Sequence, residues 1–155
     1  MSGYYKRERS DVFDDSGWFH TGDRVTMING VPWFKGRYKE MIKTQGANVS
    51  PREVELVLEG HPDVREAIVV AVTTQPHGES VAAVLVWEGV EGDTDSIREF
   101  ARTYLSSFKI PRVIVGLHGD EIPLLGSGKP DKLRIAAMIQ NGVLISAETS
   151  TPRGE

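Results

Sequence analysis

Two apolar runs close together in the chain restrict the fold more than any other feature. Ala67–Val72 and Val81–Trp87 are each of strand length, and the polar segment Thr73–Ser80 lies between them. Runs this short and this apolar are typical of strands with one or both faces buried. The sequence therefore predicts two adjacent strands joined by a polar loop.

Patterns that predict helices come before and after these two runs. Residues 50–53 read Ser-Pro-Arg-Glu, which combines a capping serine, a proline at the first helical position and a glutamate three residues after the serine. Apolar residues recur at helical spacing from Ile97 to Leu105, Val113–Leu117 is a further strand, and a last helix is expected at about residues 131–140. With an extended stretch at Met41–Thr44, this order predicts an α+β domain with a roughly three-stranded sheet and about three helices.

A short β-hairpin is predicted before this domain. Asp23–Ile28 and Val31–Phe34 flank Asn29-Gly30. This dipeptide accepts positive φ at both central positions of a type I′ turn, which is the tight turn that suits a twisted hairpin. The segment before the hairpin, from Met1 to about Gly17, is polar and aromatic without a clear period.

Composition excludes several classes of function. The 18 basic against 22 acidic residues give a formal charge of −4, so binding to nucleic acid through phosphate neutralisation is not expected. The absence of cysteine excludes disulfides and thiolate metal sites and fits a reducing cytoplasm. The four histidines lack metal-ligand spacing, and no transmembrane segment is expected because no apolar stretch approaches the ~18 residues that a membrane helix needs.

Three charged residues near the hairpin are candidates for ligand binding. Asp23 follows a glycine at a strand entrance, where a carboxylate can accept two hydrogen bonds from vicinal hydroxyls. Arg37 and Lys39 follow the hairpin, where they can hold sugar or phosphate oxygens. Taken singly, each residue also fits a structural alternative. Asp23 could simply cap a turn, and Arg37 and Lys39 could be solvated charges at a strand end.

A fourth candidate, Lys129, stands in the loop Leu124–Pro130, which contains Gly126 and Gly128. The loop lacks the glycine and the Ser or Thr of a phosphate-binding P-loop, since Pro123 and Pro130 occupy those positions. It offers one lysine on a flexible glycine-bounded loop, although the loop taken alone favours a surface lysine without a function.

In their order along the chain, these residues resemble the motifs of the adenylate-forming superfamily, which includes acyl-CoA synthetases and peptide-synthetase adenylation domains. Residues 17–23, Gly-Trp-Phe-His-Thr-Gly-Asp, resemble its Tyr/His-x-Thr-Gly-Asp motif. Residues 36–55 resemble its longest motif, which covers the hinge, and residues 123–132 resemble its last motif, around the catalytic lysine. The resemblance spans about residues 3–140 and is strongest to a fatty-acid or medium-chain acyl-CoA ligase.

The resemblance implies an ATP-dependent carboxylic acid–CoA ligase that forms an acyl-adenylate and then a thioester with CoA, with Mg²⁺ as the metal. The roles that it implies are catalysis for Lys129, nucleotide binding for Asp23 and Arg37, a hinge at Lys39, and a face toward the CoA thiol for Lys43, Gly46 and Asn48.

By the same resemblance, residues 1–37 would be the trailing segment of a large N-terminal AMP-binding domain plus the hinge. Residues 38–141 would be the mobile C-terminal domain, and residues 142–155 a disordered tail. The chain alone would be inactive and would bind no cofactor tightly, because the ATP phosphate loop and the acyl pocket belong to the missing N-terminal domain. Two alternatives stay open: part of a peptide-synthetase-type adenylation domain, or a stand-alone binding module without catalysis.

Overall fold

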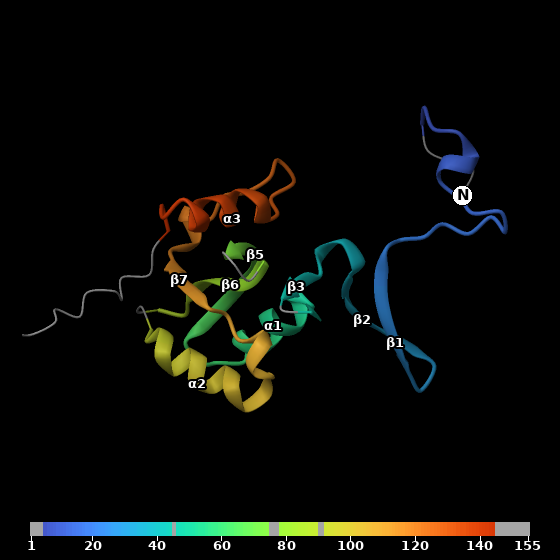
Figure 1. The fold of residues 1–155 in the computed structure, drawn as a ribbon. Coiled ribbons are helices and arrows are strands. Elements are labelled where there is room, and N and C mark those ends of the chain that lie inside the picture. Colours follow the sequence, from blue (N-terminus) through green and yellow to red (C-terminus); the bar gives the residue numbers. More distant parts are fainter. Residues whose placement is uncertain (1–4, 45, 75–77, 90–91, 145–155) are drawn as a thin grey trace, which may run out of the picture. The chain divides into compact units, whose positions relative to one another are not determined.

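The computed structural model describes residues 5–44, 46–74, 78–89 and 92–144 (Figure 1). The chain divides into two compact units, Met1–Glu40 and Met41–Glu155. This division is compatible with the predicted change of domain near residue 37, which stays a prediction. Most of the tail predicted at 142–155 lies outside the described residues.

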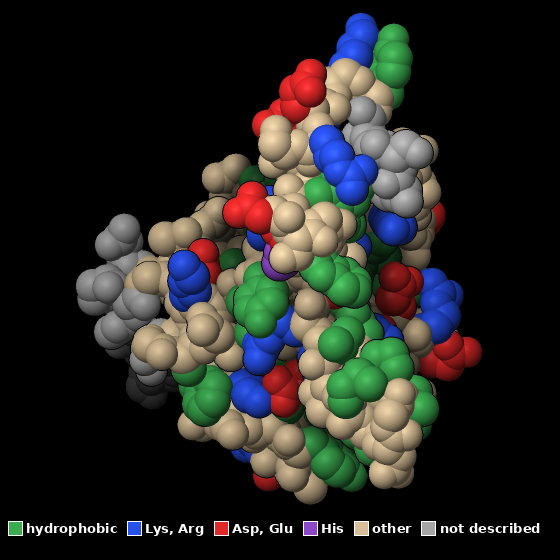
Figure 2. All heavy atoms as spheres, turned by 90° about the vertical axis from the view of Figure 1, so that its right-hand side faces the viewer, with side chains coloured by type: hydrophobic (Ala, Val, Ile, Leu, Met, Phe, Trp, Pro, Cys, Tyr) green, Lys and Arg blue, Asp and Glu red, His purple; other side chains and the backbone are tan. Residues whose placement is uncertain are grey.

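The first unit contains the predicted hairpin. Strand β1 (Asp23–Ile28) pairs antiparallel with β2 (Val31–Arg37), and 3₁₀ turns precede and follow it at Arg9–Asp11 and Tyr38–Glu40. Asn29 and Gly30 have φ of 51° and 79°, as the type I′ turn requires. None of the apolar side chains of the hairpin is buried, and hydrophobic side chains stand at the surface in the view of Figure 2. The hairpin thus has no core of its own.

The second unit is built on a five-stranded mixed sheet, which confirms the α+β class with two strands more than the roughly three expected. Strands β5 and β6 contain the two apolar runs and pair antiparallel, as predicted. Strand β7 pairs parallel with β6, and the short β3 and β4 form a hairpin beside it. The strands are β3 (Ile42–Thr44), β4 (Ala47–Val49), β5 (Val64–Thr74), β6 (Gly78–Trp87) and β7 (Val113–Leu117).

Helices cover both faces of this sheet (Figure 1). Alternate residues of a strand point to opposite faces, so Val69 and Leu85 pack with α1 and α2 while Val70 and Val84 pack with α3. Both faces are therefore buried, which explains why β5 and β6 are apolar at nearly every position. The helices are α1 (Pro51–Leu58), α2 (Thr94–Tyr104) and α3 (Lys132–Gln140).

Side chains cap two of the three helices. Asp93 accepts hydrogen bonds from the first-turn amides of α2, and Asp131 does the same for α3. At α1 the predicted cap differs: Ser50 has the extended backbone of a capping residue, but its side chain makes no cap hydrogen bond. Glu53, the other half of the expected capping box, instead accepts a hydrogen bond from Lys109 at 2.6 Å. Glu53 thus forms an ion pair with a residue far along the chain in place of the expected local capping hydrogen bonds.

Candidate functional site

In the first unit, the hairpin brings two predicted nucleotide-binding residues together. The register places Asp23 opposite Arg37 at the open end of the hairpin. Nε of Arg37 donates to Oδ1 of Asp23 at 2.9 Å, and both side chains reach solvent. The Asn29-Gly30 turn sets the pairing from Ile28–Val31 back to Val25–Phe34, and an irregularity between Arg24 and Val25 then shifts the register by one residue. That shift brings Asp23 opposite Arg37, which the turn alone would not do.

Lys39 follows this pair within the 3₁₀ turn Tyr38–Glu40, and its side chain is exposed. The main-chain N–H of Tyr38 donates to the carbonyl of Gly22 at 2.9 Å, so the base of the hairpin is closed just before Lys39. The boundary between the two compact units comes one residue after Lys39, between Glu40 and Met41. A pivot at Lys39 stays a prediction.

In the second unit, Lys43, Gly46 and Asn48 belong to one small hairpin. Lys43 pairs with Asn48 across β3 and β4, so the two side chains share the exposed face, while Ile42 and Val49 share the buried one. Gly46 has φ of 84°, and a Cβ there would meet nothing within 4 Å. Glycine is therefore favoured at this position by the backbone conformation and not by crowding.

Lys129 lies in a closed loop immediately before α3. Leu124 and Pro130 form an isolated antiparallel bridge, and the N–H of Leu125 donates to the carbonyl of Lys129 at 2.8 Å. A second main-chain bond runs from Gly128, whose φ is 78°, to the carbonyl of Leu125 at 2.9 Å. The Lys129 side chain is exposed, and its ammonium makes no hydrogen bond or ion pair within the described part of the chain.

The loop is thus more ordered than a glycine-bounded arm suggests. Its main chain is held by internal hydrogen bonds while its lysine is left unengaged. No hydrogen bond or ion pair joins Lys129 to Lys43 or Asn48 among the residues that the structure describes. The predicted residues therefore form three local groups, the Asp23–Arg37 pair, the β3–β4 hairpin and the lysine loop, with Lys39 by itself in the turn Tyr38–Glu40.

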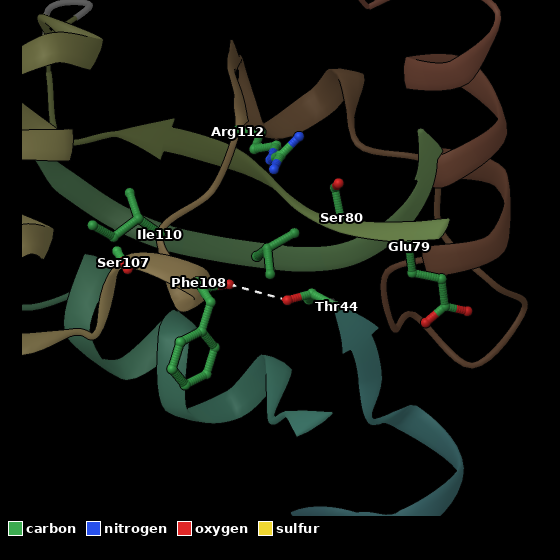
Figure 3. Close-up of a pocket in the computed structure, with 8 residues that line it drawn as sticks. Thr44, Glu79, Ser80, Ser107, Phe108, Ile110 and Arg112 are labelled. Atoms are coloured by element: carbon green, nitrogen blue, oxygen red, sulfur yellow. Dashed lines mark hydrogen bonds between the residues drawn. The ribbon is translucent and has the colours of Figure 1, made fainter. Parts of the chain in front are cut away.

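Sequence reasoning missed a polar pocket in the sheet of the second unit (Figure 3). Strand β3 pairs with β6 at Gly78 and β7 begins to pair at Ala82, which leaves a gap along β6 between them. The pocket in this gap has a volume of about 250 Å³. Its polar and charged lining comes from several elements and includes Thr44, Glu79, Ser80, Ser107 and Arg112. Nothing in the local sequence marks these residues, because the gap is created by how far each neighbouring strand extends.

A buried carboxylate, Glu55 of α1, was also not singled out. It is 7% exposed and accepts hydrogen bonds from Lys132 and from the main chain of β5. Both residues belong to the motif-like segments, but nothing in the sequence indicates that they meet. Among the described residues no group of three or more His, Asp or Glu could hold a metal ion. No helix in that part of the chain is long and apolar enough to cross a membrane.

Comparison with known proteins identifies the family to which this domain is similar. Residues 53–129 match the family described as the AMP-binding enzyme C-terminal domain. The chain is 37% identical over 144 residues to a medium/long-chain-fatty-acid–CoA ligase of Mycobacterium tuberculosis, covering 87% of this chain and 25% of that protein. It is 39% identical over 142 residues to triostin synthetase I of Streptomyces triostinicus, covering 89% of this chain and 27% of that protein.

A solved structure shows the same arrangement of elements. An amide bond synthetase from Marinactinospora thermotolerans matches with a TM-score of 0.75 and 33% identity, over 84% of this chain and 26% of that one. The chain thus spans about a quarter of the length of the relatives that it matches. It belongs to the adenylate-forming enzymes and carries the C-terminal domain of these AMP-binding enzymes.

Proposed function

We propose that this chain is the lysine-bearing domain of an ATP-dependent carboxylic acid–CoA ligase and that Lys129 acts in acyl adenylation. The observation that carries the proposal is the state of Lys129, an unengaged cation on a loop held by its own main-chain hydrogen bonds. Lys129 is also the last residue of the segment that matches the family. Relatives named as fatty-acid–CoA and medium-chain acyl-CoA ligases support the reaction class.

In the first half-reaction, a carboxylate oxygen attacks the α-phosphorus of ATP. A new P–O bond forms, the bond to pyrophosphate breaks, and acyl-adenylate and pyrophosphate result. The ammonium of Lys129 holds the carboxylate beside phosphorus and offsets the negative charge that develops there. A lysine without a competing carboxylate partner suits this role, because none of its charge is already neutralised.

In the second half-reaction, the CoA thiol attacks the acyl carbon, AMP leaves, and the thiol proton is released to solvent or a base. We assign the face toward the thiol to the β3–β4 hairpin, where Lys43 and Asn48 project together and Gly46 presents bare main chain. Rotation about Lys39 exchanges the lysine loop for this hairpin at the reaction centre. The exposed position of Lys39, one residue before the end of the first compact unit, is compatible with a hinge.

We assign nucleotide binding to Asp23 and Arg37. Asp23 accepts hydrogen bonds from the ribose hydroxyls, and Arg37 orients its carboxylate through the 2.9 Å contact. The described residues offer no cluster that fits Mg²⁺, so we place the metal, the acyl pocket and the phosphate loop in a large N-terminal domain. The exposed apolar side chains of the β1–β2 hairpin would contact that domain, and this chain alone would be inactive.

The test compares the two half-reactions in the longer enzyme that carries this domain. Lys129→Ala should lower pyrophosphate exchange on the order of 10²–10³-fold, the typical effect of removing one group that stabilises a charged transition state. Thioester formation from a supplied acyl-adenylate should be unchanged. Arg134→Ala is the matched control, because it removes another exposed cation in the first turn of α3. Equal loss of both half-reactions in Lys129→Ala would contradict the assigned role.

A second candidate is acyl transfer from the adenylate to an amine. The similarity to triostin synthetase I and to an amide bond synthetase favours it, since neither is named for CoA. The two candidates share the adenylation step and differ only in the acceptor. Supplying acyl-adenylate with CoA or with a panel of amines separates them, and an amide as the sole product would exclude the ligase.

A further inference from the structure

The carboxylate of Glu55 joins three elements of the second unit. Glu55 lies on α1 and is 7% exposed. Its Oε1 accepts a hydrogen bond from Nζ of Lys132 on α3 at 2.7 Å and from the main-chain N–H of Val69 on β5 at 3.1 Å. Its Oε2 lies 3.6 Å from a guanidinium nitrogen of Arg52. A buried carboxylate needs such partners, because an uncompensated charge is costly away from water.

Strand β5 holds this carboxylate independently of Lys132. It lies at the edge of the sheet, with β6 as its pairing partner. Its outward N–H groups at Ala67 and Val69 donate to Glu59 at 3.4 Å and to Glu55 at 3.1 Å. Glu55 of α1 and Glu59, the residue that caps the C-terminus of this helix, thus cover an edge that would otherwise be unpaired. Glu55 is fixed to the body of the domain, and Lys132 binds to that fixed point.

Lys132 connects this point to the lysine loop, since it follows Lys129 by three residues and begins α3. Among the described side chains of residues 123–132, Lys132 alone forms a hydrogen bond or ion pair with another element. The Asp131 side chain accepts only from the first turn of α3, and Leu124 and Leu125 are 56% and 49% exposed. The main-chain bonds of the loop hold its shape, but they do not attach it to α1 or to β5.

We propose that Glu55 and Lys132 are a positioning pair that fixes the Lys129 loop on the body of the domain. The role of the pair in catalysis rests on the proposed function. When the domain rotates, the pair makes the lysine move with the sheet and α1. A lysine that must lie beside the α-phosphate loses rate when its base shifts, because a misplacement of about 1 Å can cost on the order of 10²-fold.

The first measurement needs no activity. Hydrogen exchange by NMR on the 155-residue chain reports the hydrogen-bonded amides of Leu125, Gly128 and Asp131. In Lys132→Gln these amides should exchange faster, while those inside β5 and β6 stay as protected as in the parent chain. Lys132→Arg should restore protection, because a guanidinium can also reach the carboxylate.

Glu55→Gln is the second variant, and it avoids leaving a buried charge without its cation. Its side-chain carbonyl can still accept from the N–H of Val69, so α1 keeps its contact with β5, but the ion pair with Lys132 is lost. It should loosen the same loop amides as Lys132→Gln. Unchanged exchange in both variants would overturn the proposal, and so would faster exchange spread evenly over the whole sheet.

The second measurement uses the longer enzyme. Lys132→Gln should lower pyrophosphate exchange on the order of 10–100-fold and leave thioester formation from supplied acyl-adenylate unchanged, and Lys132→Arg should recover adenylation. A loosened loop with unchanged adenylation would overturn the positioning role. If the parent enzyme catalyses no pyrophosphate exchange with any carboxylic acid, the proposed function falls, whereas hydrogen exchange still decides whether the pair fixes the loop.

Discussion

Gly116 lies so close to Trp87 that a single added methyl group should destabilise the domain. Trp87, at the end of β6, is 7% exposed and packs in the core shared with α1 and α2. A Cβ at Gly116 would overlap Nε1 of the indole and lie 3.0 Å from Cε2 and 3.2 Å from Cζ2. On another side, a Cβ at Gly92 would lie 2.9 Å from Cζ3. The main chain therefore lies close to the indole on two sides.

We expect Gly116→Ala to lower the free energy of unfolding by about 2 kcal/mol, within the usual range for overpacking a buried site. For a chain of this size that corresponds to a fall in Tm of roughly 4–8 °C. Urea denaturation followed by circular dichroism measures the change, and an unaltered m-value would assign it to the folded state. Gly126→Ala is the matched control, because a Cβ there meets nothing within 4 Å. Its effect should stay within about 0.5 kcal/mol.

A double-mutant cycle tests the cause. Trp87→Leu removes Nε1, Cε2 and Cζ2, the atoms that the new Cβ would approach, and Nε1 is a buried donor without a hydrogen-bond partner among the described residues. If the clash is the reason, Gly116→Ala should cost less in the Trp87→Leu background, with a coupling of about 0.5–3 kcal/mol. Additive effects, or a Gly116→Ala change no larger than that of Gly126→Ala, would refute the reasoning.

Three further predictions concern the first unit. In the longer enzyme, Lys39→Pro should slow thioester formation selectively because proline fixes φ at the hinge, with Lys39→Ala as control; an unaffected thioester rate would count against the pivot. Asp23→Asn should raise the KM for ATP roughly 10–100-fold, the value of a hydrogen bond to a charged group, and Arg37→Ala should raise it less; unchanged KM values would remove both from the nucleotide site. The main-chain N–H of Trp18 donates to the Asp14 carboxylate and lowers its pKa from the ordinary 3.8. The ionised carboxylate therefore contributes fully to the stability of this turn above pH 3.8, and the contribution is lost as the pH falls through the lowered pKa. The Trp18 amide resonance in a pH titration checks this, and a transition above 3.8 would contradict the sign.

Much of the local structure followed from the sequence because it depends on neighbouring residues. Asn29-Gly30 determines the turn and the pairing of the neighbouring residues up to Val25 and Phe34. The irregularity between Arg24 and Val25, which places Asp23 opposite Arg37, did not follow from the turn. The apolar runs predicted β5 and β6 because strands buried on both faces carry few polar residues. The order of the motifs indicated the family, which the comparisons confirmed.

Contacts between residues far apart in the chain could not be predicted in this way. Glu53 binds Lys109 in place of the local capping box, and Glu55 meets Lys132, 77 residues away. Which carboxylate meets which lysine depends on where α1, β5 and α3 pack, and no local pattern encodes that packing.

The sequence by itself determined the hairpin, the two central strands and the order of the candidate residues, because turn chemistry and hydrophobic period act over a few positions. Only the tertiary structure decided that Lys132, three residues after Lys129, meets Glu55 of α1. It also decided that Gly116 must lack a side chain. Both contacts join residues of separate elements, and only the packing of the folded domain brings these residues within contact distance.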